Sequence, residues 1–187
     1  MRRVLTACAI AVAALTFAAP ASAKGPKIGV FGKINGQRLK AVPKKRAPGL
    51  VQSDYSVDPA LGTAVFTLAA TEVPKRRGKT QVIIISCLSP TSTPPWTADC
   101  IASYGESQFK KRTYLENIWL ASAEIVGTLQ TVGPFHVTVE SFDGATVRGR
   151  FSGTLDSNQS CNQGACVETT SLGTISAEGT FTVPDSF

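Results

Sequence analysis

The sequence predicts an all-β fold, an antiparallel β-sandwich or open barrel made of a single domain. Two segments, 147–155 and 174–183, alternate apolar and polar residues with a period of two. That period is typical of a half-buried antiparallel strand, because successive side chains point to opposite faces of a sheet. Several such segments separated by turn residues favour a sandwich or barrel over a helical fold.

Residues 1–23 have the features of a secretory signal peptide. Arg2 and Arg3 form a positive end, 4–17 is an apolar run, and Ala21-Ser22-Ala23 offers small residues for cleavage. The apolar run is shorter than the about 20 residues that span a bilayer, which disfavours a membrane anchor. We therefore expect cleavage after Ala23 and a mature chain, 24–187, that forms one domain without a transmembrane span.

The first two strands of the mature chain flank an Asn-Gly turn. A two-residue turn at Asn35-Gly36 would place Lys33 opposite Arg38. Like charges directly opposite each other destabilise a sheet. We therefore expect a three-residue loop, 34–36, which instead pairs Phe31 with Leu39.

The middle of the chain supplies further strands and two proline-rich loops. Residues 63–69 favour a strand, and 82–85 is apolar on both faces, which predicts a central strand that is covered on both sides. The proline-rich stretches 43–49 and 88–98 predict loops. Apolar residues in 115–129 recur at helical spacing, but Gly127 and the Thr and Val content favour strand. We expect mostly strand there and allow one short helical turn near 105–112.

A second turn, at Asp143-Gly144, precedes the alternating segment 147–155. A two-residue turn would place Val139 opposite Arg148, which sets an apolar residue against a charged one. A three-residue loop, 142–144, pairs Val139 with Val147 and Phe135 with Phe151. Because the apolar face fixes strand register, we expect the three-residue loop, with Gly144 in the left-handed conformation.

Four cysteines remain after cleavage of the signal: Cys87, Cys100, Cys161 and Cys166. An even number in an exported chain predicts two disulfides and a secreted or periplasmic location. Three pairings are possible, and the short separations favour Cys87–Cys100 with Cys161–Cys166. A zinc site is disfavoured, because the chain has one His and no paired C-x-x-C spacing.

The sequence contains no catalytic set. His136 is the only imidazole, it falls on the polar face of its segment with Thr138 and Glu140, and no nucleophile motif accompanies it. Motifs for phosphate cradling or calcium binding are absent from the sequence. We expect a protein that is not an enzyme and has no metal or cofactor. A hydrolase with an unmarked pair of carboxylates is an alternative.

Charge is distributed unevenly along the chain. Residues 24–112 hold 15 Lys and Arg against five acids, whereas 113–187 hold two Arg against eight acids. Three basic loop clusters carry the excess, and we name them as candidate polyanion-binding residues: Lys44, Lys45 and Arg46; Lys75, Arg76, Arg77 and Lys79; Lys110, Lys111 and Arg112. If these loops converge, they form a patch for an anionic envelope polymer. If they are dispersed, they serve solubility.

The two tryptophans of the mature chain are the last residues considered as candidates for a binding site. Trp119 is expected in the core, whereas Trp96, which follows Pro94-Pro95, is expected to be exposed. An exposed Trp96 loop or a free sheet edge would suit a structural or protein-interaction module, which is a second alternative. Basic and aromatic residues do not interleave as on a nucleic-acid platform, so nucleic acid is not an expected partner.

Two segments resemble a known group of proteins. Residues 30–41 (VFGKINGQRLKA) and 147–155 (VRGRFSGTL) are similar to segments of small exported bacterial envelope proteins with an Ile/Val-Asn-Gly hairpin after the export signal. This family has a Trp where Leu39 stands and carries a lipid-attachment Cys that is missing here. The resemblance implies an exported β-sandwich whose function is unknown.

Overall fold

The computed structural model describes residues 27–43, 51–73, 78–110, 113–121, 135–162, 165–168 and 170–185. The predicted signal peptide, 1–23, lies outside this part of the chain. The described residues form eleven strands and no helix, so the fold is all-β as predicted. The strands are β1 (Gly29–Ile34), β2 (Gln37–Ala41), β3 (Val51–Asp58), β4 (Thr63–Glu72), β5 (Thr80–Ser89), β6 (Trp96–Lys110), β7 (Thr113–Ala121), β8 (Phe135–Phe142), β9 (Thr146–Asn162), β10 (Ala165–Glu168) and β11 (Thr174–Pro184).

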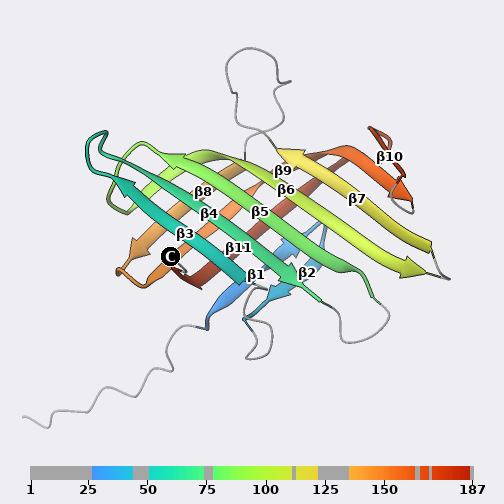
Figure 1. Ribbon diagram of the computed structural model, residues 1–187, viewed down its shortest axis with the longest axis horizontal. Helices are drawn as coiled ribbons and strands as arrows, with labels where there is room; N and C mark the ends of the chain where they lie inside the picture. The colour runs from blue at the N-terminus through green and yellow to red at the C-terminus, as the bar shows by residue number, and fades with distance from the viewer. Residues whose placement is uncertain are drawn as a thin grey trace, which may run out of the picture.

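All eleven strands belong to one antiparallel sheet. Its order is β2-β1-β11-β9-β7-β6-β5-β4-β3, and β10 pairs with the far end of β9. The long strands β6 and β9 enclose a gap that two shorter strands fill end to end. β7 pairs with both long strands at one end, and β8 pairs with both at the other (Figure 1).

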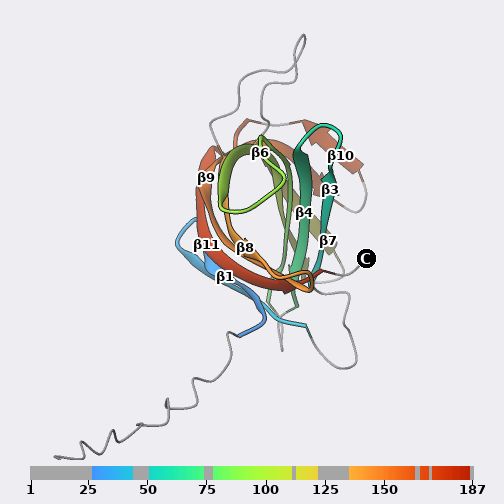
Figure 2. The same cartoon turned by 90° about the vertical axis from the view of Figure 1, so that its left-hand side faces the viewer.

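The sheet curls round on itself, as the view along it shows (Figure 2). Contacts between the two ends of the strand order bring it toward closure. The Ser53 hydroxyl of β3 donates to the Pro184 carbonyl of β11 over 2.7 Å, and the Tyr55 amide donates to Asp185 Oδ1 over 3.2 Å. On the other side, the Lys40 amide of β2 donates to Glu72 Oε2 of β4 over 2.5 Å. The fold is therefore an open barrel or sandwich with one continuous interior.

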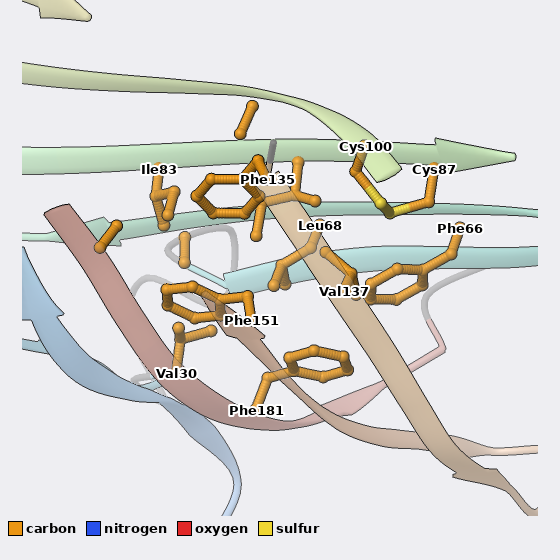
Figure 3. Packing of buried hydrophobic residues seen from close by; sticks show 14 of the residues in the cluster. Val30, Phe66, Leu68, Ile83, Cys87, Cys100, Phe135, Val137, Phe151 and Phe181 are labelled. Carbon is orange, nitrogen blue, oxygen red and sulfur yellow. A yellow bond between two sulfur atoms is a disulfide. The ribbon is translucent and has the colours of Figure 1, made fainter. Parts of the chain in front are cut away.

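Inward-facing side chains from nearly every strand fill that interior (Figure 3). Phe66 of β4 stacks on Phe181 of β11 with ring centroids 5.2 Å apart, and Phe135 of β8 stacks on Phe151 of β9 at 5.9 Å. The predicted apolar faces of 147–155 and 174–183 both point into this core, and the two segments pair with each other in β9 and β11. Period-two alternation thus identified the inner face correctly.

Both predicted disulfides are present in their favoured pairing. Cys87 and Cys100 are directly opposite on β5 and β6, and Cys161 and Cys166 are opposite on β9 and β10. The first bridge lies in the core, where both sulfurs are buried. Two such bridges fit a protein of an oxidising compartment. The described chain also contains no helix with the length and hydrophobicity needed to cross a lipid bilayer.

Two predictions about single segments are wrong. The helical turn allowed near 105–112 is not found in the described residues, because β6 continues as strand to Lys110 and pairs with β7 along that length. Strand β5 is central but covered on one face only. Ile83 and Ile85 are buried, whereas Ile84 is 49% exposed, because the sheet encloses a single core and its outer face meets solvent.

Both hairpin registers also differ from prediction. Asn35-Gly36 forms a two-residue turn with both residues at positive φ, so Lys33 does lie opposite Arg38. The Asp143-Gly144 turn leaves four residues, 143–146, between the paired residues Phe142 and Val147, and an irregularity at Glu140 lies before the turn on β8. As a result Val137, not Phe135, faces Phe151. Asp143 Oδ1 explains the longer loop, because it accepts hydrogen bonds from the amides of Ala145 and Thr146.

Candidate functional site

The predicted loop clusters fall mostly outside the described residues. Lys44, Lys45, Arg46, Lys75, Arg76, Arg77, Lys111 and Arg112 are all in this position, and for Lys110 only its place at the end of β6 is described. Lys79 is the exception. Its ammonium forms an ion pair with Glu106, a carboxylate whose side chain is 8% exposed. The charge of Lys79 is thereby balanced within the fold.

Trp96 is not the exposed aromatic that the sequence suggested. Its side chain is 5% exposed, its Nε1 donates to the Tyr55 hydroxyl over 3.0 Å, and its ring stacks on that of Tyr55. The reason lies four residues further along β6. Cys100 faces the core to reach Cys87, and the period of two places Trp96 on the same face. Trp119 is buried, as expected.

A concentration of positive charge lies elsewhere, on the outer face of β2, β1, β11 and β9. Strand register aligns two rows of outward side chains across these four strands. The first row runs Lys40, Phe31, Thr180, Arg150, and the second runs Arg38, Lys33, Glu178, Ser152.

All members of the two rows except Lys40 line an open groove of about 650 Å³. A smaller hollow of about 370 Å³ adjoins it and adds Lys27, Lys40 and Thr182 to the lining. Together these surfaces, here called the basic groove, carry five cationic side chains and one carboxylate, Glu178. The half-buried ring of Phe31 lies among them.

Most of these cations are not neutralised by neighbours. Arg150 has a partner in Glu140, at 3.8 Å, but both side chains are more than half exposed, so water weakens the attraction. No carboxylate of the described residues lies within 4.0 Å of the charged groups of Lys33, Arg38 or Lys40. The groove therefore presents free positive charge to a ligand.

Beneath the groove the strand backbones pack closely at glycines. Gly32 of β1 lies opposite Gly179 of β11, which lies opposite Phe151 of β9. A Cβ at Gly32 would lie 2.2 Å from the Glu178 carbonyl oxygen, so only glycine permits this approach of β1 to β11. These glycines thus allow β1, β11 and β9 to pack closely at the floor of the groove.

The groove residues carry no signal in the sequence that sets them apart from ordinary surface. Lys33, Arg38, Lys40 and Arg150 each occupy the polar face of an alternating strand, a pattern that ordinarily indicates solvated surface. Only β1 and β2 are neighbours in sequence. Their convergence with β9 and β11 depends on strand order, which alternation does not reveal.

A histidine and a carboxylate meet at the border of the groove. His136 Nδ1 lies 2.5 Å from Asp99 Oδ1, and His136 is opposite Ser152 in register. Both side chains are at least half exposed, and among the described residues no hydrogen bond joins Ser152 to His136. In a nucleophile–base–acid triad that bond links the nucleophile to its base, and the described residues do not show it here.

Comparison with known proteins adds no further constraint. No family model, curated protein or solved structure matches this chain. Among the described residues, no group of three or more metal-ligating side chains comes together.

Proposed function

We propose that this is a non-enzymatic binding protein of the cell envelope or extracellular space, which holds an anionic polymer in the basic groove. One observation supports the proposal: five cationic side chains against a single carboxylate line one open groove. Two disulfides agree with an exported protein that works in an oxidising compartment.

The spacing of the cations suits an extended polymer. Lys40 and Arg150 occupy the ends of one cross-strand row, three strand intervals apart. Adjacent strands are about 4.8 Å apart, so the row is about 14 Å long. A chain with an anionic group on each of two or three successive repeat units would meet both ends. Phe31, between them, offers an apolar surface to the backbone of such a polymer.

Each exposed cation contributes little by itself, because water and salt screen it. Several acting together give an affinity that falls steeply as salt rises. The loop clusters at 44–46, 75–77 and 110–112 would extend the same field if they lie near the groove. The groove can bind without them.

Retention on an immobilised polyanion across a salt gradient tests the proposal. The wild-type protein should elute well above physiological ionic strength, about 0.15 M. The variant Lys33→Gln/Arg38→Gln/Arg150→Gln should elute near or below it. The matched control, Lys44→Gln/Lys45→Gln/Arg46→Gln, loses the same number of charges and should elute close to wild type.

Two results would contradict the groove as the binding site. Equal retention of the groove variant and the wild type would show that the groove does not hold the polyanion. Loss of retention in the loop variant alone would move the site to the loops.

A second function is favoured by the apolar outer face of β4, β5 and β6. Val65, Ile84, Leu88 and Ile101 are between 40% and 66% exposed. Val65 is opposite Leu88 and Ile101 is opposite Ser86, so the four lie within one area of the sheet. Exposed apolar patches of this kind mark protein interaction sites. We propose this face, rather than a sheet edge or Trp96, as the surface of the alternative protein-interaction module.

Salt separates the two functions. A partner held on the apolar face should stay bound at about 1 M salt, where exposed charges are screened within about 3 Å. It should be released by the double change Ile84→Gln/Leu88→Gln. A partner that still binds the Ile84→Gln/Leu88→Gln variant but is eluted by salt is bound by the basic groove instead.

A further inference from the structure

The two hollows of the basic groove meet at one aromatic ring. Phe31 and Thr180 line both hollows. Of the cations, Arg150 lines only the larger hollow and Lys40 lines only the smaller one. A ligand that spans the two halves of the groove must therefore pass over Phe31.

The charges of the first cross-strand row lie at its ends. Lys40 and Arg150 are separated by Phe31 and Thr180, which carry no charge. A single nucleic-acid strand carries one phosphate about every 3.4 Å, so about four phosphates would lie along this row of about 14 Å. The middle phosphates would face no cation of the row. The row suits a polymer whose acidic groups are separated by larger uncharged parts.

Phe31 offers an apolar surface between these cations. Its ring is half-buried, and its Cζ lies 3.0 Å from the position that a Cβ of Gly29 would occupy. The ring therefore leans along its own strand, into the space that Gly29 leaves free, and it lines the groove from there. Aromatic side chains provide large apolar contact areas. On a carbohydrate, the C–H face of a sugar ring is the surface that matches them.

Glu178 places a carboxylate among the cations. It lies between Lys33 and Ser152 in the second row, and among the described residues no hydrogen bond or ion pair engages its side chain. The side-chain hydroxyls of Ser152, Thr180 and Thr182 are likewise unengaged within the described chain. A carboxylate only accepts hydrogen bonds, whereas a hydroxyl both donates and accepts. Glu178 thus repels a second anion but accepts from a hydroxyl, which favours a ligand that carries hydroxyl groups beside its charges.

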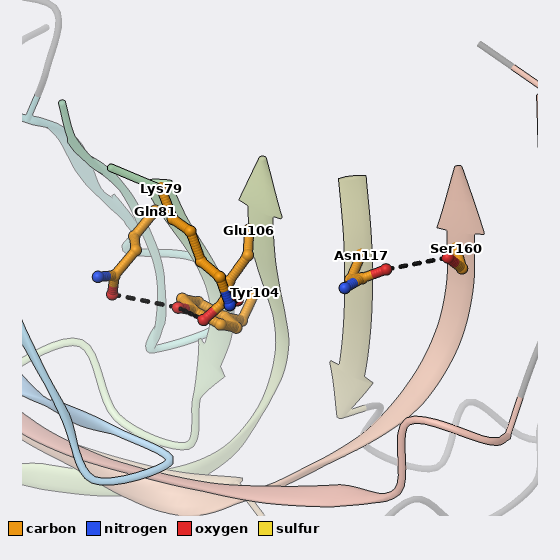
Figure 4. Close-up of polar contacts among 6 residues, drawn as sticks. All are labelled: Lys79, Gln81, Tyr104, Glu106, Asn117 and Ser160. Carbon is orange, nitrogen blue, oxygen red and sulfur yellow. Dashed lines mark hydrogen bonds and ion pairs between the residues drawn. The ribbon is translucent and has the colours of Figure 1, made fainter. Parts of the chain in front are cut away.

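A different carboxylate, inside the curled sheet, provides a contrast (Figure 4). Glu106 Oε2 accepts from Lys79, and Glu106 Oε1 accepts from the Tyr104 hydroxyl over 2.9 Å. Both oxygens of that carboxylate are therefore occupied within the fold. Glu178 and Lys33 are neighbours in register, but their charged groups are more than 4.0 Å apart. Both groups remain available to a ligand in the groove.

We infer that the polymer bound in the basic groove is an acidic polysaccharide, in which carboxylates alternate with uncharged sugar units, a conclusion that rests on the proposed function of the groove. The carboxylates of the polymer pair with Lys40 and Arg150. An uncharged sugar ring lies on Phe31, and ring hydroxyls donate to Glu178. Polyphosphate and nucleic acid lack this combination of spaced charges, apolar ring faces and neighbouring hydroxyls.

Three polyanions, compared at equal concentrations of charge, separate these classes of ligand. The purified protein is titrated calorimetrically at about 0.15 M salt with hyaluronan, in which a uronate alternates with an uncharged N-acetylated sugar, with long-chain polyphosphate and with single-stranded DNA. We expect hyaluronan to bind about tenfold more tightly than the other two, the low end of what stacking on one aromatic ring contributes. Dextran, an uncharged polysaccharide, should not bind measurably.

Two variants test the individual contacts. Phe31→Leu keeps an apolar side chain but removes the ring, so it should weaken hyaluronan binding about tenfold and leave polyphosphate binding within about twofold of wild type. The retained polyphosphate binding shows that this variant is folded. Glu178→Gln should strengthen polyphosphate binding, because a repelling charge is gone, whereas hyaluronan loses a charge-assisted hydrogen bond and should gain nothing. The matched control, Glu168→Gln on β10, removes the same charge outside the groove and should change neither affinity.

Three results would overturn the inference. Equal or tighter binding of polyphosphate or DNA would make the groove a general polyanion surface or a nucleic-acid site, and binding of a polyanion by the groove would still stand. Equal weakening of all three polymers by Phe31→Leu would show that the ring makes no contact particular to a sugar. Binding of none of the three would remove the proposed function together with the inference.

Discussion

The ring of Phe151 on β9 covers Gly179, its cross-strand partner on β11. A Cβ at Gly179 would lie 2.6 Å from Phe151 Cζ and 2.6 Å from the Phe31 carbonyl oxygen. The neighbouring pair repeats the arrangement in reverse, with Phe181 over Gly149. Each glycine makes room for a core aromatic ring from the opposite strand, and together they join β9 to β11 beneath the basic groove.

Gly179→Ala is therefore expected to lower the free energy of unfolding by about 1–3 kcal/mol, because the backbone oxygen of Phe31 cannot move as a flexible side chain could. Urea denaturation measures the change. Gly105→Ala on β6 is the control, since its nearest neighbour, the Asn117 carbonyl oxygen, would be 3.9 Å away. Equal stability of the two variants would contradict the packing argument.

The two disulfides should contribute unequally to the free energy of unfolding. Cys87 and Cys100 are 13 residues apart, and Cys161 and Cys166 are five apart. Chain entropy predicts that removing the longer loop's bridge costs about 3 kcal/mol and removing the shorter one about 2 kcal/mol. Paired Cys→Ala variants, compared by denaturation, test the order. Intact mass of the oxidised wild type should show no free thiol in the mature chain, and a free thiol would contradict the pairing.

The same substitution at the two tryptophans should have unequal effects. Trp96→Phe removes a buried hydrogen bond to Tyr55 and leaves that hydroxyl without its donor, which should cost about 1–2 kcal/mol beyond the lost volume. Trp119→Phe removes no hydrogen bond within the described chain and should cost less. Denaturation midpoints of the two variants decide this. A larger loss for Trp119→Phe would show that Trp119 Nε1 has a partner in the folded protein.

Tyr104 should make stability fall in alkaline solution. Burial raises the pKa of its phenol above the ordinary value of about 10, and the nearby Glu106 charge and hydrogen bond raise it further. The unfolded phenol then loses its proton near pH 10 while the folded one keeps it. Its stabilising contribution is therefore complete below about pH 9 and declines as pH rises through 10 and beyond.

Thermal melts between about pH 8 and 11 measure this decline, and Tyr104→Phe is the comparison. The variant loses the Glu106 hydrogen bond at every pH, so its baseline is lower, but its slope above pH 9 should be shallower than that of the wild type. Parallel slopes would show that Tyr104 ionises equally in both states.

The positions of strands could be predicted from this sequence, but the register and order in which the strands pair could not. Alternation identified the inner faces of β9 and β11, since burial of every second residue leaves a direct trace in composition. Repulsion between the like charges of Lys33 and Arg38 does not decide the register at the first turn. Both side chains are exposed, so water screens their repulsion, while Asn-Gly strongly favours the two-residue turn.

Two further differences have separate causes. Trp96 was predicted to be exposed, but assigning Cys100 to the core would have placed it inside, because four residues in a strand return to the same face. The basic groove did not follow, because its cations come from strands far apart in sequence. Nothing local in β1 or β2 indicates that β11 and β9 will continue the sheet beside them.

The pairing of β1 with β11 has a consequence for how the chain acquires its fold. Every hydrogen bond of that pair joins residues from opposite ends of the domain. Synthesis begins at the N-terminus, so the β1–β2 hairpin must wait with one edge unsatisfied until Thr174–Pro184 emerges. Such long-range pairing is slow, and an unpaired strand edge can form hydrogen bonds with other chains in the meantime. Polar side chains on that hairpin, Lys33, Arg38 and Lys40 among them, would keep nascent molecules apart during the delay.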